Sequence, residues 1–220
     1  MAIGRTPHML ATDPLEPTAD DWFGWTFTED RAIFNPAVGF AKEWGAMRES
    51  FVVVNMETTG LDPESSETLE ISALLVEPTG TVRSEFSKLV KVAYPVSDDI
   101  LKLIGVTQEQ LALEGLPLAQ VMKDFMAFVA FRSIFLQNAT VDLPFLKKAM
   151  ERLDQTFDES VYDIDYMALM IWTEVQVRGF NALAAHVSAP QTRPRSIDDA
   201  KAALAILLAA REAAVIQSWD

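Results

Sequence analysis

One apolar run in the first half of the chain constrains the fold most. Residues 51–56, FVVVNM, place three valines and a phenylalanine side by side, which predicts a buried strand. The turn formers at 58–60 and Asp62-Pro63 end this strand. Glu57 lies between strand and turn, and a charged residue there is uncommon unless it is paired or at the surface. The run therefore predicts a core strand with a carboxylate at its end.

The elements after this run predict one mixed sheet with helices on its faces. Two further strands are expected at 68–77 and 81–90, joined by a hairpin turn at 78–80, which favours an antiparallel start. Shorter strands are expected at 133–137 and around Tyr162. Helices are expected at 97–104, 107–113 with a capping box, 118–131, 142–153, 165–175, 180–186 and 196–214.

The N-terminal part differs from the rest of the chain. Prolines break any periodicity there, and a short helix is expected only at 34–48. We expect an arm with this helix at 1–50 and a folded domain at 51–215. The arm's aromatic residues either dock on their own domain or anchor a protein partner, because such side chains dominate binding hot spots. They are Trp22, Phe23, Trp25 and Phe27.

Composition narrows the classes of function. The chain has 220 residues, half of them hydrophobic, and its 18 Lys and Arg against 32 Asp and Glu give a net charge of −14. Such a charge repels phosphate at long range, which excludes a protein that coats nucleic acid but allows one that holds it through metal ions. Cysteine is absent, so no thiolate can act as a ligand or nucleophile. We expect a cytoplasmic protein without a membrane span.

A few carboxylates fall at the ends of the predicted elements. Asn55 and Glu57 share one face of the first strand, about 6.5 to 7 Å apart. Asp142 opens a helix after a strand, and Asp199 lies in the first turn of the last helix. Each has a simpler explanation, because Asp142 also suits a helix N-cap and Asp199 follows Ser196 at capping-box spacing. Three segments thus each offer an acid that a fold can bring together.

Three motifs give these acids a family context. Residues 55–63 (NMETTGLDP) resemble the first motif of the DEDD exonucleases, D-x-E-T-T-G-L-D-P, and 138–146 (NATVDLPFL) resemble the second, H-N-A-x-F-D-x-x-F-L. Residues 194–200 (PRSIDDA) resemble the third, H-R-A-L-D-D-A. The family includes the proofreading subunit of bacterial DNA polymerase III and related RNases. The similarity extends from about Phe51 to Ala210.

The resemblance implies a fold and a reaction. The fold is ribonuclease-H-like, with a mixed sheet of about five strands flanked by helices. In this family two divalent ions, Mg or Mn, held by four carboxylates cleave single-stranded DNA or RNA from its 3′ end. The ligand positions correspond to Asn55, Glu57, Asp142 and Asp199. The positions that hold the terminal nucleotide correspond to Thr58, Thr59, Gly60, Leu61 and Asn138.

The departures from the family pattern predict weak or lost activity. Asn55 replaces the aspartate that contacts both ions, and its amide keeps an oxygen but loses the charge. Pro194 replaces the general-base histidine, a group that usually contributes about 10² to 10⁴ in rate. Gln137 and Val141 replace a histidine and an aromatic residue of the second motif. The alternatives are a catalytically inactive scaffold in a nucleic-acid-processing complex and, less favoured, a small-molecule phosphodiesterase.

Other titratable residues are expected to be structural. His186 lies too far before Asp199 to take the place of the missing base, and a helix-surface position explains it better. Asp198 is expected to be a solvated helix residue. Asp163 and Asp165 are expected to serve the junction between a strand and a helix.

Overall fold

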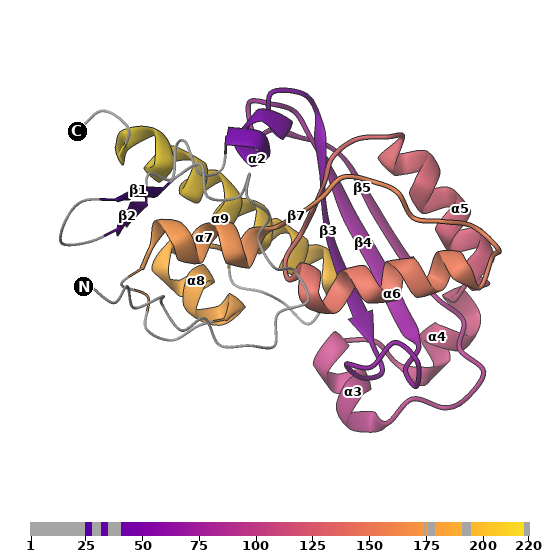
Figure 1. Cartoon of the computed structure of the whole chain (residues 1–220). Coiled ribbons are helices and arrows are strands. Elements are labelled where there is room, and N and C mark those ends of the chain that lie inside the picture. The colour runs from indigo at the N-terminus through magenta and orange to yellow at the C-terminus, as the bar shows by residue number, and fades with distance from the viewer. Residues whose placement is uncertain are drawn as a thin grey trace, which may run out of the picture.

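A computed structural model describes residues 25–27, 32–34, 41–173, 175, 179–190 and 195–217. Its centre is a five-stranded sheet in the order β5-β4-β3-β6-β7 (Figure 1). The strands β3, β4 and β5 are successive antiparallel neighbours, whereas β6 runs parallel to β3 and β7 parallel to β6. This confirms the expected mixed sheet of five strands. The bounds are Phe51–Thr58 for β3, Thr68–Val76 for β4, Val82–Leu89 for β5, Ile134–Leu136 for β6 and Val161–Asp163 for β7.

The burial of the strands follows their place in the sheet. Every residue of β4 is buried, and so are the first six of β3. The edge strand β5 buries only Phe86 and Leu89 and exposes its charged and polar residues. Polar residues on an edge strand discourage pairing with another chain. The long central pair β3–β4 is therefore the most buried part of the sheet, and it carries Glu57 and Glu70.

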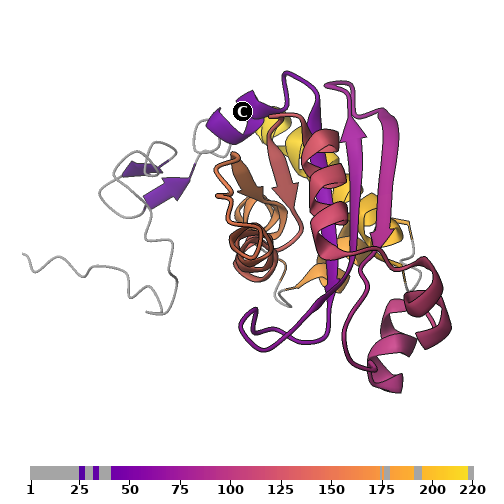
Figure 2. The same ribbon diagram turned by 90° about the vertical axis from the view of Figure 1, so that its right-hand side faces the viewer.

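Helices cover both faces of the sheet. One apolar cluster joins β3 and β4 to α7 (Ile164–Ile171), α8 (Phe180–His186) and α9 (Ser196–Gln217). A second cluster joins the other face to α5 (Leu118–Val129) and α6 (Ala139–Glu151). Figure 2 shows α9 behind the sheet and α5 in front of it. Alternate residues of β3 point to opposite clusters, because side chains alternate faces along a strand.

Two short helices lie beyond the ends of β3 and β4 (Figure 1), α3 at Asp98–Ile104 and α4 at Gln108–Glu114. The capping box predicted before α4 is confirmed. The Thr107 hydroxyl accepts from the Gln110 backbone at 3.1 Å, and the Gln110 side chain accepts from the Thr107 backbone at 2.9 Å. A third small apolar cluster, around Leu69 and Leu111, fixes these helices against the sheet.

Several boundaries differ from the prediction. Of the helix expected at 34–48, the described residues contain α2 at Ala41–Ala46, while Phe34 belongs to a strand and residues 35–40 lie outside the described part of the chain. A small antiparallel pair, β1 (Trp25–Phe27) and β2 (Ala32–Phe34), was not predicted. The strand expected to reach Val90 ends at Leu89, and α7 ends at Ile171 instead of 175, because Trp172 leaves the helical conformation with φ −107° and ψ 72°.

The structure does not test the prediction for the N-terminal aromatic residues. Trp22 and Phe23 lie outside the described residues, and the side chains of Trp25 and Phe27 are not described. Their docking on the domain or on a partner stays a prediction, as does the division of the chain at residue 50. Among the described helices, none combines the length and the apolar character needed to cross a bilayer.

Candidate functional site

The predicted site residues meet at the end of β3. Asn55 and Glu57 lie on this strand, Asp142 in the first turn of α6 and Asp199 in the first turn of α9. The negative charges of Asp142 and Asp199 both interact with that of Glu57. The fold thus places Glu57 between two acids that come from distant parts of the chain, on elements that cover opposite faces of the sheet.

The pKa values of Glu57 and Asp199 reflect this crowding. Burial is the first cause that raises the pKa of Glu57, to about 7, and the charges of Asp199 and Glu70 raise it further, while a hydrogen bond from Asn55 opposes them. Burial likewise raises the pKa of Asp199 to about 6, with contributions from Asp198 and Glu70. Burial and neighbouring negative charges thus both favour the protonated forms of these two acids.

Asp142 is not the helix cap that its sequence context suggested. The helix begins at Ala139, so Asp142 is the fourth helical residue, and only 7% of it is exposed. Burial raises its pKa to about 8, the Asn138 backbone opposes this by a hydrogen bond, and the charges of Glu57, Asp163 and Asp165 add to the rise. The cap interpretation was wrong because the chain enters the helix one turn earlier, at Asn138, which makes no side-chain cap bond.

Asn55 forms a buried junction with the start of α9. Its Nδ2 donates to Ser196 Oγ at 3.2 Å, and Ser196 Oγ donates to the Asn55 backbone carbonyl at 3.0 Å. The same Nδ2 lies 3.4 Å from Glu57 Oε1. The Ser196 hydroxyl is thus engaged with β3, which corrects the expectation that it caps its own helix in a box with Asp199. Sequence reasoning gave Ser196 only this capping role.

Glu70 is a second residue that the sequence analysis missed. It lies opposite Glu57 on β4 and is completely buried. Its carboxylate accepts from Ser87 Oγ at 2.7 Å and from Arg195 Nη2 at 2.8 Å and Nε at 3.4 Å. A signal was available, because a charged residue inside the apolar strand 68–76 (TLEISALLV) is as unusual as Glu57 at the end of its own strand.

The loop after β3 is held in one shape by its own hydrogen bonds. Thr58 Oγ1 donates to the Gly60 carbonyl at 2.6 Å, and the Thr59 hydroxyl accepts from the Glu67 backbone at 2.9 Å. A Cβ at Gly60 would lie 2.7 Å from Ser66 Oγ, so a larger residue there would require the Ser66 side chain to move. Leu61 projects from this loop with 80% of its surface exposed. The predicted cradle residues 58–61 therefore form a fixed loop with an exposed apolar tip.

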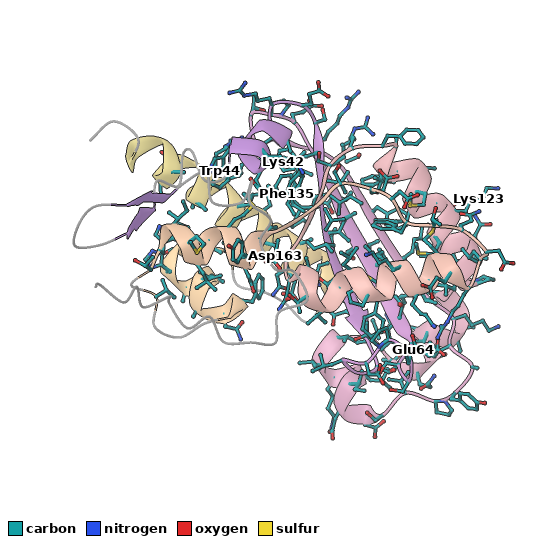
Figure 3. All side chains as sticks on the ribbon, in the orientation of Figure 1. Lys42, Trp44, Glu64, Lys123, Phe135 and Asp163 are labelled. Atoms are coloured by element: carbon teal, nitrogen blue, oxygen red, sulfur yellow. The ribbon has the colours of Figure 1, made fainter. Side chains whose placement is uncertain are left out.

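Ion pairs tie the same loop to α6. Lys148 Nζ lies 2.9 Å from Glu64 Oε2, and Arg152 Nη1 lies 3.1 Å from Glu67 Oε2. Figure 3 labels Glu64 at the lower end of the sheet, below α6. The predicted cradle residue Asn138 immediately precedes this helix and is half-buried. The loop and Asn138 are thus connected through one helix.

Two cavities lie at opposite ends of the sheet, and one of them adjoins the loop after β3. One of about 340 Å³ lies beside the loop, lined by Thr59, Ser65 and Glu67 on one side and by residues 92–97 and Ile100 on the other. A larger one of about 670 Å³ lies between residues 45–50 and 130–133, at the start of β3 and β6 and hence at the opposite end of the sheet from the acids. Only the smaller cavity adjoins the predicted cradle, and its volume suits a small ligand.

The acids after β7 form the expected strand-to-helix junction. The carboxylate of Asp163, labelled in Figure 3, accepts from the Tyr166 backbone and from the Ala139 backbone, both at 2.8 Å, and so connects the starts of α7 and α6. Burial raises the pKa of Asp165 to about 7, Asp163 adds to the rise, and a side-chain hydrogen bond from Gln137 opposes it. Gln137, where the family pattern has histidine, thus contacts a structural acid.

Neither His186 nor Pro194, which stands where the family pattern has histidine, supplies a general base to this site. His186 is exposed on α8, and its ring lies 4.8 Å from that of Trp172, in keeping with the expected surface role. Pro194 lies outside the described residues. Asp198, expected to be solvated, is half-buried beside the Arg195 charge.

The site does not fit the family's pair of metal ions. In the described part of the chain, no three Asp, Glu or His side chains lie close enough together to hold an ion. Moreover, the Asn55 amide directs a hydrogen-bond donor at Glu57, the place where a shared cation would require two oxygens. The elements that carry the four predicted ligand positions approach one another, but Asn55 is bonded to Glu57 and Ser196 there.

Comparison with solved structures defines the class of fold. The chain is similar to the nuclease domain of 3′hExo, described as a DEDDh family member bound to rAMP, with a TM-score of 0.61, 17% identity and coverage of 74% of this chain and 91% of that one. It is also similar to E. coli exonuclease I in complex with a dT13 oligonucleotide, with a TM-score of 0.63, 13% identity and coverage of 72% and 40%. The fold is that of the ribonuclease-H-like exonucleases.

The sequence comparisons name the family. The exonuclease family model RNase_T matches residues 52–207, and the chain belongs to this family. It is 28% identical over 161 residues to the PolC-type DNA polymerase III of Clostridium perfringens, covering 72% of this chain and 11% of that protein. It is 34% identical over 100 residues to the DNA polymerase III epsilon subunit of Aquifex aeolicus, covering 45% and 48%. The chain thus matches about a tenth of the PolC-type relative and about half of the epsilon subunit.

Proposed function

We propose that this domain binds the 3′ end of single-stranded DNA or RNA and hydrolyses it slowly or not at all. The observation that carries the proposal is the contact of Asn55 Nδ2 with Glu57 Oε1 at 3.4 Å. Where the family pattern has a carboxylate that contacts both ions, this chain has an amide donor facing the neighbouring acid. The loss of one charged ligand weakens metal binding, and the replacement of histidine by Pro194 removes the base that would deprotonate water.

The proposed ligand follows from the parts of the site that keep the family pattern. Residues 58–61 retain the motif T-T-G-L, and their loop is fixed by hydrogen bonds and by ion pairs to α6. The exposed Leu61 offers an apolar surface for a nucleobase, since bases stack on apolar and aromatic side chains. Exonuclease I, which shares the fold, is described in complex with an oligonucleotide. These features support a single-stranded end as the ligand.

Two assays test the proposal. First, the protein is titrated into a fluorescent single strand whose label is at the 5′ end, with a blunt duplex of the same sequence as the control. We expect tighter binding of the single strand, and weaker binding after Leu61→Ser. Equal binding of both nucleic acids, or no effect of Leu61→Ser, would contradict the proposed ligand.

The second assay measures cleavage of the single strand with Mg or Mn. We expect the natural chain to cut far more slowly than the double variant Asn55→Asp with Pro194→His, because that variant restores both missing groups. Glu57→Ala in the double variant is the matched control and should abolish the recovered cutting. Cutting by the natural chain at ordinary enzyme rates, abolished by Glu57→Ala, would refute the proposal.

A scaffold function is the second candidate, and the sequence of the N-terminal part favours it. Residues 22–27 contain four aromatic side chains in a chain of net charge −14, and aromatic residues are frequent anchors at protein interfaces. The test is recovery of partner proteins by the natural chain and by Trp22→Ala with Trp25→Ala. We expect the variant to lose a partner, and unchanged recovery would count against this candidate.

A further inference from the structure

We propose that the hydrogen bonds between Asn55 and Ser196, here called the Asn55–Ser196 clasp, take the place of a divalent cation in joining the end of β3 to the start of α9. The inference rests on the proposed function, because it explains how a family member without the metal pair keeps the shape of the site. It concerns the stability of the domain and not its reaction.

The clasp is reciprocal and buried. Asn55 Nδ2 donates to Ser196 Oγ at 3.2 Å, and Ser196 Oγ donates to the Asn55 backbone carbonyl at 3.0 Å. The two residues are 141 positions apart, Asn55 is 4% exposed and Ser196 is fully buried. A buried polar group that loses its partner pays the full cost of desolvation. The two residues therefore depend on each other.

The network itself determines which way the Asn55 amide faces. A serine hydroxyl has one hydrogen, and that of Ser196 is used on the Asn55 carbonyl. The Asn55 side-chain atom that faces Ser196 Oγ must then be a donor, which is the amide nitrogen. The amide's other hydrogen is directed toward Glu57 Oε1 at 3.4 Å. Asn55 thus donates a hydrogen bond to each of these two neighbours. A cation at this place would attract the same oxygen atoms by its positive charge.

An aspartate at position 55 could not make these contacts. Its two oxygens are acceptors, so an ionised carboxylate would face the Glu57 carboxylate and a hydroxyl whose hydrogen is already used. Such a group of acceptors needs a proton or a cation between them. The third motif quoted above, H-R-A-L-D-D-A, has alanine where this chain has Ser196, and alanine cannot make the clasp. Asn55 and Ser196 are thus two departures that fit each other.

The residue before Ser196 strengthens the same junction. Arg195 reaches the buried Glu70 on β4 with its Nη2 at 2.8 Å. Two consecutive residues at the start of α9 are therefore tied to two neighbouring strands. Asp199 follows within the first turn of α9, so its place near Glu57 is set by these ties without a metal ion.

The test is the melting temperature of the full chain with EDTA and with millimolar Mg or Mn, without nucleic acid. Ser196→Ala should lower the melting temperature in EDTA by about 4–8 °C, the effect expected when two buried hydrogen bonds are lost in a domain of this size. Ser72→Ala is the matched control, because Ser72 is equally buried, lies opposite Asn55 on β4 and has no hydrogen-bond partner for its hydroxyl among the described residues. It should leave the melting temperature unchanged or raise it.

The dependence of the melting temperature on Mg or Mn distinguishes the clasp from an ordinary buried hydrogen bond. The natural chain should melt at the same temperature with and without Mg or Mn. Asn55→Asp with Ser196→Ala should melt lower in EDTA and rise by several degrees with Mn, because a bound ion stabilises the folded state. A rise of several degrees for the natural chain, or an equal effect of Ser196→Ala and Ser72→Ala, would overturn the inference. Rapid cutting by the natural chain would instead refute the proposed function, while the comparison of the two serine variants would still decide the clasp.

Discussion

Arg195 forms an ion pair with the completely buried Glu70 in this site, and removal of this pair gives a sharp prediction. Glu70 is fully buried, whereas the Arg195 side chain is 36% exposed, and their closest atoms are 2.8 Å apart. Replacing Arg195 by methionine keeps the aliphatic part of the side chain but leaves a buried carboxylate without its cation. Glu57 and Asp199, two further acids, interact with Glu70 and add to the repulsion.

The expected loss is about 3 kcal/mol of unfolding free energy. Breaking a buried ion pair by removing one partner costs about 3–5 kcal/mol, and the partial exposure of Arg195 places this pair at the lower end. For a chain of this size the loss corresponds to a fall in melting temperature of roughly 6–12 °C. Urea denaturation of the natural chain and of Arg195→Met at pH 7 measures it.

The chain offers a matched control in Arg152, which pairs with Glu67 at 3.1 Å with both side chains more than a third exposed. Arg152→Met should cost less than about 1 kcal/mol, because exposed pairs contribute little. Adding Glu70→Gln to Arg195→Met should recover most of the loss, since the buried charge is then removed. Equal effects of Arg195→Met and Arg152→Met, or no recovery in the double variant, would refute this reasoning.

Three further predictions concern stability. The pKa of Asp165 is raised to about 7 in the folded state, so the unfolded chain releases this proton at lower pH and the free energy of unfolding falls as pH rises. Relative to the natural chain, Asp165→Asn should gain about 2 kcal/mol of unfolding free energy between about pH 5 and pH 8 in urea titrations. Parallel curves of unfolding free energy against pH for the two proteins would contradict this. Thr107→Ala removes the capping box with Gln110 and should cost about 1 kcal/mol, with faster amide exchange confined to α4. Gly115→Ala would push a methyl group into the Leu111 carbonyl oxygen and should lower the melting temperature more than Thr107→Ala; the opposite order would refute it.

The main sheet could be predicted because its strands carry strong local signals. The run FVVVNM and the strand at 68–76 are long, apolar and bounded by turn formers, and the structure forms both. The capping box at Thr107 is equally local and is confirmed. In contrast, the pair β1–β2 has strands of three residues each, too short for a periodic pattern to develop.

The site was predictable only in part, because its decisive contacts are not local. The positions of Glu57, Asp142 and Asp199 follow from motifs of a few residues each. The partners of Asn55 and Glu70 lie 141 and 125 positions away, and no spacing rule connects them. The N-cap alternative for Asp142 was wrong because N-cap propensity belongs to many positions, and only the folded chain shows that the helix begins at Ala139.

The packing of α9 has a consequence for how this domain reaches its folded state. Its Ala203, Leu204 and Leu207 cover the face of β3 and β4, yet about 140 residues are synthesised between the end of that strand and this helix. Contacts between such distant segments form slowly, because a long loop must close first. During synthesis α7 and α8 are made first, and the part of this face that α9 covers remains open until the last helix is made. The apolar surface of β3 and β4 beneath α9 is therefore the last part of this core to be covered as the chain is made.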